Sequence, residues 1–207
     1  MNNYRTMITA HAGAEDTPAN TMESIRILAA CGADAVEVDV RLLNGVPVMT
    51  HDAPGENCEP LSECLPELAR HDGLLVNLDM KESGQTAAVA GMVRESGMSG
   101  RTILTGGVDD GELSEAKAAG MEVWCNDDAA PGDAPLPERV SARGLDIINI
   151  DYREVDEALL QDPRRLSVWT VNEEADLRRF LAAGVRNITT RKPLLALRLR
   201  REMEESD

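Results

Sequence analysis

The chain has 207 residues, a formal net charge of −16 and a pI near 4.6. This charge argues against nucleic acid and anionic membranes as partners, because both would be repelled and the sequence holds no basic patch. A hydrophobic fraction of 43% is enough to bury a core, so we expect one domain spanning residues 1–207.

The sequence shows no sign of export or membrane insertion. The four cysteines form no Cys-x-x-Cys pair and are too few to brace a domain of this size with disulfides. The N-terminus lacks the regions of a signal peptide, and no apolar run is long enough to cross a bilayer. We therefore expect a cytoplasmic protein without a transmembrane segment, whose oligomeric state the sequence leaves open.

The first predicted strand covers residues 6–10 and ends at His11. After a loop, Asn20 or Thr21 offers a side-chain cap to an amphipathic helix, which Gly32 ends. This strand and helix form the first of several predicted βα units.

The second predicted strand covers residues 35–42. Asn44 and Gly45 are a tight-turn signal, and the chain after them is expected to run back beside the strand and to end at His51. A helical stretch then leads to a third strand over residues 74–80.

The same alternation continues to the C-terminus. Strands are predicted in TILTG, EVWCN, IINID, LSVWTV and NITT, and helices in TAAVAGMVRESG, ELSEAKAAG, VDEALLQ, EADLRRFLAAG and the segment from Pro193. The stretch PGDAPLPERVSARG is expected to be a loop. About eight strands, each with a helical connection, predict an α/β protein with a compact (β/α)8 TIM barrel; its loops must be trimmed, since such barrels usually have about 250 residues.

Two carboxylates interrupt the second strand. Side chains of a strand alternate between faces, so Glu37 and Asp39 in VEVDVRL share one face and the valines occupy the other. Burying two like charges side by side costs free energy unless a cation or a proton intervenes. Exposed carboxylates at a sheet edge would give the same letters, but the apolar flanks favour a buried pair and hence a divalent-metal site.

The third strand also carries polar groups on one face, namely Asn77, Asp79 and Lys81. Lysine occurs at only two other positions, so a lysine beside an apolar strand is notable. Asp79 and Lys81 could form a plain ion pair. Their alternation nevertheless predicts that they face the same site as Glu37 and Asp39.

His11 and His51 end apolar runs that we expect beside the carboxylate pair. A single histidine at a strand end is more often a capping or packing residue, but two of them flanking a carboxylate pair favour chemistry. Cleavage of a phosphoester needs a base, an acid and a cation on the phosphate oxygens. The sequence therefore predicts this reaction class.

Several short motifs follow one another along the chain: HAG, PANT, GAD, EVDV, VMTHD, NLDMK, VWTVN and GVRNITTRKP. In order and spacing they resemble His-Arg-Gly, Pro-Glu-Asn-Thr, Gly-Ala-Asp, Glu-x-Asp-Val, Val-x-x-His-Asp and the later segments of the glycerophosphodiester phosphodiesterase family. The resemblance covers nearly the whole chain. It implies a TIM-barrel hydrolase of lipid metabolism.

The resemblance also implies roles for individual residues. His11 and His51 match the family's acid/base pair, with His51 as the acid. Glu37, Asp39 and Asp79 match the metal ligands, and their oxygen donors favour Mg²⁺ or Ca²⁺ over zinc. The implied reaction is the metal-dependent cleavage of a glycerophosphodiester, or a related small phosphodiester, to an alcohol and glycerol phosphate.

Two further residues match substrate contacts, since Lys81 is implied to contact the phosphate and Trp169 to line the substrate pocket. Three positions depart from the family pattern: Ala12 replaces an arginine, Ala19 a glutamate and Thr190 an aspartate. Losing an arginine and a glutamate together favours a compensated change, because losing one alone would leave an unpartnered charge.

Two other functions stay open. Without the arginine and the glutamate, the chain would also suit a catalytically degenerate barrel that binds phosphorylated ligands. The same site would serve a metal-assisted lyase acting on a lipid-derived phosphodiester. The segment after His51 is short where the family usually inserts a small subdomain, so the sequence does not identify the phosphodiester.

Overall fold

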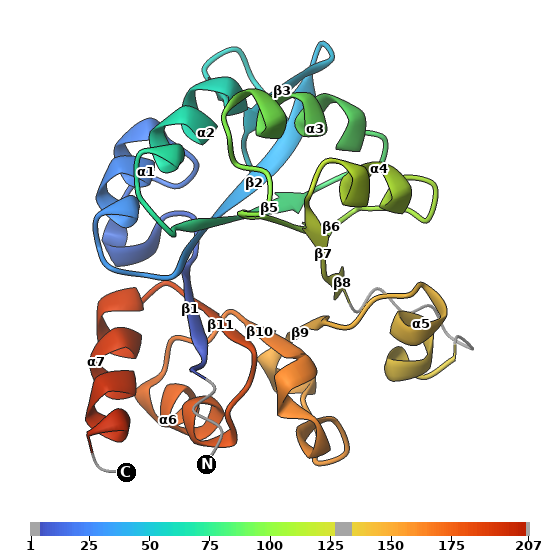
Figure 1. The fold of residues 1–207 in the computed structure, drawn as a ribbon. Helices are drawn as coiled ribbons and strands as arrows, with labels where there is room; N and C mark the ends of the chain where they lie inside the picture. Colours follow the sequence, from blue (N-terminus) through green and yellow to red (C-terminus); the bar gives the residue numbers. More distant parts are fainter. Residues whose placement is uncertain (1–4, 127–133, 206–207) are drawn as a thin grey trace.

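The computed structural model describes residues 5–126 and 134–205, in which strands and helices alternate around a curved sheet (Figure 1). The strands of the barrel are β1 (Met7–Ala10), β2 (Ala35–Leu43), β5 (Leu75–Met80), β6 (Thr102–Gly106), β7 (Glu122–Val123), β8 (Cys125–Asn126), β9 (Ile148–Asp151), β10 (Leu166–Trp169) and β11 (Asn187–Thr190). The helices are α1 (Met22–Ala29), α2 (Leu61–Ala69), α3 (Thr86–Glu95), α4 (Leu113–Ala118), α5 (Leu136–Ala142), α6 (Glu174–Ala183) and α7 (Pro193–Glu204).

The strands form a nearly closed parallel barrel. Their order is β7-β6-β5-β2-β1-β11-β10-β9-β8, and the pairings along it are parallel. The two ends of this order, β7 and β8, are separated in the chain only by Trp124, whose backbone N–H donates to the Leu104 carbonyl oxygen at 2.9 Å. With β7 and β8 taken as one interrupted strand, the described residues contain eight barrel strands, which confirms the predicted α/β class and TIM-like fold.

The hairpin after β2 forms as predicted. Asn44 and Gly45 have φ angles of 53° and 82°, the left-handed values that a two-residue turn of this kind requires. Strand β3 (Val46–Met49) then returns antiparallel to β2, and the short β4 (Glu59–Pro60) pairs with β3. The Thr50 N–H donates to the Asp39 carbonyl oxygen at 3.0 Å, so the hairpin returns the chain beside Asp39 just before His51.

The prediction of a helix over residues 155–161 is wrong. The chain between β9 and β10 forms the 3-10 turns η2 (Tyr152–Glu154), η3 (Leu159–Gln161) and η4 (Pro163–Arg165). A proline disfavours the α conformation in the residue before it, and Asp162 before Pro163 indeed has φ/ψ of −131° and 69°.

The expected loop over residues 131–144 is also wrong in part, because α5 forms within it. Pro137 lies in the first turn of α5, where its missing N–H costs no intrahelical hydrogen bond. Val140 is the one buried residue of this short helix. Such a brief apolar signal is hard to separate from loop sequence, and residues 131–133 of this expectation lie outside the described residues.

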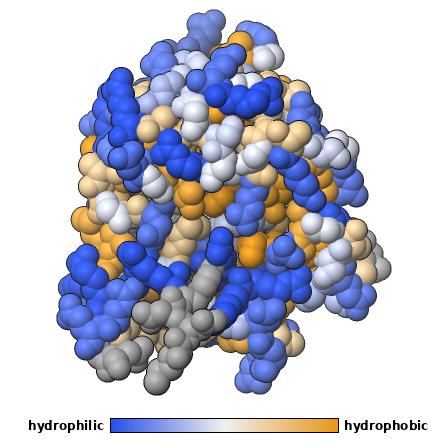
Figure 2. Space-filling model, viewed as in Figure 1, coloured by the Kyte–Doolittle hydropathy of each residue, from blue (hydrophilic) through white to orange (hydrophobic). Residues whose placement is uncertain are grey.

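The helices bury apolar side chains against the outside of the barrel. Val36, Val38 and Val40 on the outer face of β2 are fully buried, which leaves the inner face to Glu37 and Asp39. The face shown in Figure 2 is mostly hydrophilic, with smaller apolar patches. Among the described helices, none is both long and apolar enough to span a bilayer.

Candidate active site

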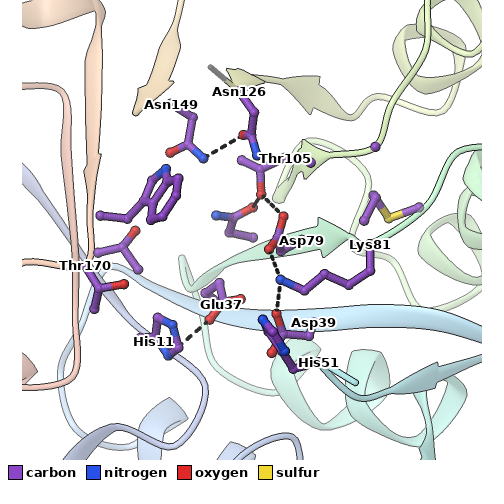
Figure 3. Close-up of a pocket in the computed structure, with 16 residues that line it drawn as sticks. His11, Glu37, Asp39, His51, Asp79, Lys81, Thr105, Asn126, Asn149 and Thr170 are labelled. Atoms are coloured by element: carbon purple, nitrogen blue, oxygen red, sulfur yellow. Dashed lines mark hydrogen bonds and ion pairs between the residues drawn. The ribbon is translucent and has the colours of Figure 1, made fainter. Parts of the chain in front are cut away.

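A pocket of about 470 Å³ opens among the carboxyl ends of the barrel strands, the end at which barrel enzymes carry their active sites (Figure 3). It is lined by all seven side chains for which a role was predicted: His11, Glu37, Asp39, His51, Asp79, Lys81 and Trp169. The β2, β5 and β1 strands are neighbours in the sheet, which explains why residues far apart in the sequence meet here.

The two carboxylates of β2 are buried and held by hydrogen bonds. Glu37 is 5% exposed, and its Oε2 accepts a hydrogen bond from the Ala12 N–H at 2.8 Å. Asp39 is 3% exposed, and its Oδ2 accepts one from Asn20 Nδ2 at 2.7 Å. The Asp39 N–H in turn donates to Asn20 Oδ1 at 3.0 Å, so Asn20 orients Asp39 instead of capping α1, whose cap is Thr21.

A third carboxylate completes an acidic cluster. Glu37, Asp39 and Asp79 each offer an oxygen, and these atoms lie within 4.8 Å of one another. Lys81 extends between two of them, with its Nζ 2.6 Å from Asp39 Oδ1 and also paired with Asp79 Oδ2 (Figure 3). Thr105 adds an uncharged donor, whose Oγ1 lies 3.2 Å from Asp79 Oδ1 and 3.0 Å from Asn77 Oδ1.

The acidic cluster is short of positive charge. Burial, together with the charges of Asp39 and Asp79, raises the pKa of Glu37 well above its ordinary value. Burial acts in the same direction on Asp39, but hydrogen bonds from Lys81 and Asn20 outweigh it and lower the pKa of Asp39. Burial would lower the pKa of Lys81, yet the neighbouring carboxylates raise it. The carboxylates therefore favour the ammonium form of Lys81, and Glu37 is the carboxyl whose ionised form its surroundings disfavour.

His11 lies at the end of β1 and is mostly buried, with 20% of its side chain exposed. Its Nδ1 is 2.7 Å from the Ala12 carbonyl oxygen and 3.7 Å from Glu37 Oε2. A carbonyl oxygen can only accept, so Nδ1 carries the hydrogen and Nε2 is left with its lone pair. Burial is the largest cause that lowers the pKa of His11, which favours the neutral ring.

His51 sits on the rim of the same pocket and differs sharply in exposure. Its side chain is 68% exposed, and its Nδ1 is 3.0 Å from Asp52 Oδ1. The Arg41 Nε–H donates to the His51 carbonyl oxygen at 2.9 Å and so anchors the backbone of this loop. The structure thus places one histidine in the pocket wall and the other at its mouth.

The other wall of the pocket was not predicted from the sequence. It carries uncharged amides and hydroxyls beside Trp169, namely Asn126, Asn149, Thr170 and Thr189. Asn77 and Thr105 add further uncharged groups next to the acidic cluster. Of these, the strand alternation indicated only Asn77. The others could have been found from the same signal, a polar residue at the inward-facing position near the end of a barrel strand, but asparagine and threonine are also common turn formers.

Comparisons with known proteins agree with this geometry. Residues 11–103 match the model of the glycerophosphoryl diester phosphodiesterase family. No curated protein matches the chain.

Solved structures of similar fold cover nearly the whole chain. A glycerophosphoryl diester phosphodiesterase candidate from Silicibacter pomeroyi has a TM-score of 0.83 at 21% identity, covering 98% of this chain and 95% of its own. A similar candidate from Agrobacterium tumefaciens has a TM-score of 0.81 at 18% identity, covering 97% and 99%. An Oleispira antarctica phosphodiesterase in complex with the product sn-glycerol-3-phosphate has a TM-score of 0.77 at 17% identity, covering 95% and 97%. At these identities the likeness establishes the fold.

Proposed function

We propose that the chain, whose residues 11–103 match the model of the glycerophosphoryl diester phosphodiesterase family, is a member of that family and hydrolyses a glycerophosphodiester, or a related small phosphodiester, to an alcohol and glycerol phosphate. The observation that carries the proposal is the cluster of Glu37, Asp39 and Asp79, which shares one pocket with His11 and Lys81. The bound sn-glycerol-3-phosphate of the Oleispira relative supports a glycerol phosphate as the product.

The acidic cluster fits a hard divalent cation. Its donors are all carboxylate oxygens, which favour Mg²⁺ or Ca²⁺ over zinc. The raised pKa of the buried Glu37 carboxyl agrees with a site whose own residues supply too little positive charge. When bound, such an ion would neutralise charge that builds on the non-bridging phosphate oxygens.

His11 is proposed as the base. Its Nδ1–H is engaged with the Ala12 carbonyl oxygen, so Nε2 is the atom that can accept a proton. The lowered pKa keeps the ring neutral and ready to accept. The proton would come from the attacking group, which is either water or a hydroxyl on a neighbouring carbon of the substrate. Attack by the substrate hydroxyl would give a cyclic phosphate first.

His51 is proposed as the acid. Its position at the pocket mouth suits a group that protonates an alcohol as it leaves toward solvent. The Asp52 carboxylate can accept a hydrogen bond from Nδ1–H and so fix the ring with Nε2 toward the alcohol. Lys81 adds a fixed positive charge in the pocket wall for the phosphate.

We further propose a cytoplasmic protein that acts as one domain. The described residues run from β1 to α7 as one set of βα units. All four cysteines are free thiols, which agrees with a reducing compartment.

A second candidate function is a barrel that binds phosphorylated ligands without cleaving them. Two observations favour it: Ala12 and Ala19 replace the family's charged pair, and His51 is held only on the rim. In this case the acidic cluster would still bind a metal, so metal binding alone does not separate the two functions.

The test is a screen of glycerophosphodiesters for alcohol release in Mg²⁺, Ca²⁺ or EDTA. We expect release that depends on metal, together with a metal-induced rise in melting temperature, because a ligand that binds only the native state stabilises it. A rise in melting temperature without release from any diester would support the binder. The absence of both responses would contradict both functions.

A further inference from the structure

The uncharged wall of the pocket lies at the end of a series of side-chain hydrogen bonds that runs from strand to neighbouring strand inside the barrel. In Figure 3, Asn126 and Asn149 lie across the pocket from His11 and the acidic cluster. Asn126 ends β8, Asn149 lies in β9, and Thr189 lies in β11. All three side chains line the pocket, and the latter two are at least 95% buried, with 5% and 4% exposed.

This series of hydrogen bonds begins at Thr9 in β1 and connects side chains of neighbouring strands. Thr9 Oγ1 donates to Asn187 Oδ1 at 2.7 Å, and Asn187 Nδ2 donates to Ser167 Oγ at 3.0 Å. Ser167 Oγ then donates to Asn149 Oδ1 at 2.8 Å, and Asn149 Nδ2 donates to Asn126 Oδ1 at 2.8 Å. Each side chain between Thr9 and Asn126 accepts a hydrogen bond from the one before it and donates one to the next.

This direction fixes what the chain presents to the pocket. Asn126 uses its Oδ1 as an acceptor, so its remaining polar group is the Nδ2 donor, for which no acceptor lies among the described residues. A branch reaches Thr189, whose Oγ1 accepts from Asn187 Nδ2 at 3.1 Å and therefore has its own hydroxyl hydrogen to give. Hydrogen bonds in such a chain polarise one another, which strengthens the donors at its ends.

We propose that the Asn126 amide and the Thr189 hydroxyl donate hydrogen bonds to oxygen atoms of an uncharged, hydroxyl-bearing part of the phosphodiester, and so determine specificity. This inference rests on the proposed function. Together we call Asn126 and Thr189 the donor pair. Each hydroxyl of the ligand offers lone pairs to such donors, which are left unsatisfied by a ligand without oxygen at these positions.

Other ligand chemistries fit this wall less well. A quaternary ammonium group would meet hydrogen-bond donors and the single ring of Trp169 on this wall, instead of carboxylates or a cage of several aromatic rings. An acyl chain would strip water from the amides without replacing their hydrogen bonds. A second phosphate would find no lysine or arginine among the uncharged lining residues.

The test compares two phosphates of equal charge, sn-glycerol-3-phosphate and n-propyl phosphate, which differ only in two hydroxyl groups. Their dissociation constants are measured by calorimetry in saturating Mg²⁺ for the wild type and for the variants Asn126→Ala and Thr189→Val. A neutral hydrogen bond contributes about 0.5–1.5 kcal/mol. Each variant should therefore lower the preference for glycerol phosphate by about two- to tenfold and leave propyl phosphate binding nearly unchanged.

Two further variants control the comparison. Gln161→Glu changes an exposed amide in η3 to a carboxylate and should leave the preference unchanged. Asn126→Asp keeps the acceptor for Asn149 but loses the donor, so it should lower the preference at least as much as Asn126→Ala. Retained preference in Asn126→Asp would overturn the assigned direction of the chain, and with it the proposal.

The outcomes also separate this inference from the proposed function. If the wild type binds both phosphates equally, the donor pair does not determine specificity, while hydrolysis of phosphodiesters is untouched. If both variants bind the two phosphates more weakly by the same factor, Asn126 and Thr189 have a structural role and the proposal is overturned. If the wild type binds neither phosphate and cleaves no diester, both proposals fail.

Discussion

The two walls of the pocket differ in charge. The wall from β1, β2 and β5 concentrates charge, with three carboxylates, one ammonium ion and His11 in contact. The wall from β8 to β11 carries neutral amides and hydroxyls beside Trp169, and Asn149 and Asn126 lie at the end of a series of hydrogen bonds that all run in one direction. The charged wall suits the proposed ion and phosphate group, whereas the neutral wall suits groups that only donate or accept hydrogen bonds.

This contrast has an energetic basis. Burial disfavours the ionised form of Glu37, and the charges of Asp39 and Asp79 add repulsion, so the raised pKa of Glu37 expresses the cost of this wall. A fully connected set of neutral hydrogen bonds carries no such cost and fixes the positions of its members. The charged wall is therefore the part that should respond to metal and pH, and the neutral wall should respond to neither.

The largest expected effect comes from neutralising the charged wall with Glu37→Gln. Metal affinity and activity should be lost, because one of three ligands is gone. The metal-free variant should melt at a higher temperature than the wild type at neutral pH. A carboxyl whose pKa is raised by folding destabilises the folded state when the pH exceeds its ordinary value, and glutamine removes that group.

Calorimetric titration with Mg²⁺ and Ca²⁺ measures the affinity, and melting curves in EDTA measure the stability. Asp39→Asn is the companion variant, because the pKa of Asp39 is lowered, not raised. It should lose metal affinity without the gain in metal-free stability. Unchanged metal affinity in both variants would remove these two residues from the ligand set.

The next effect concerns His11→Ala, which should lower kcat/KM by about 10²- to 10⁴-fold, the usual contribution of a general base. The pH profile is the sharper test. A base works in its neutral form, and burial lowers the pKa of His11 below the ordinary histidine value of about 6.5. At saturating metal, kcat/KM of the wild type should hold its plateau below pH 6.5 and fall only as the pH drops through the lowered pKa.

In His11→Ala the acidic limb that belongs to this residue should disappear from the profile. His71→Ala is a suitable control, since this histidine lies between α2 and β5 and does not line the pocket. An acidic limb above pH 6.5 that persists in His11→Ala would assign the base to another group.

The difference between the walls also explains what the sequence could predict. Glu37 and Asp39 stand out because charges are rare in an apolar strand, and alternation alone gives their common face. The barrel itself follows from the repeated βα pattern, since each unit carries its own signal. The neutral wall gave no such contrast, because Asn126 and Asn149 resemble ordinary turn formers, and only the closed barrel reveals that they face each other.

Asn20 shows the same limit on a smaller scale. Sequence rules offered it as a helix cap, an equally good use of its side chain. The structure gives the cap to Thr21 and turns Asn20, with φ of 57°, toward Asp39. Such a choice depends on a contact across 19 positions in the chain, which local pattern cannot contain.

A smaller effect is expected on stability from Lys81→Met, which removes the ammonium ion between Asp39 and Asp79. Leaving a buried charged partner unpaired should cost about 2–3 kcal/mol in the metal-free protein. Divalent metal should restore much of this loss, so the metal-induced rise in melting temperature should exceed that of the wild type. The control is Lys117→Met in α4, away from the pocket, and an equal metal response in all three proteins would contradict the coupling.

The smallest effect tests the replaced pair at positions 12 and 19. The loop after β1 brings these positions close, since a Cβ built on Gly13 would lie 3.0 Å from the Ala19 Cβ. Ala12 is only 3% exposed, so Ala12→Arg alone would introduce a charge into a buried place without a partner and should not raise activity. Ala19 is exposed, and a glutamate there could orient the new guanidinium toward the pocket.

A charge-assisted contact contributes about 1.5–3 kcal/mol when fully formed, so Ala12→Arg with Ala19→Glu should raise kcat/KM by about tenfold or more over either single variant. The measurement is a double-mutant cycle on kcat/KM. A coupling of zero would mean that the two alanines are independent changes and would contradict a compensated loss of the charged pair.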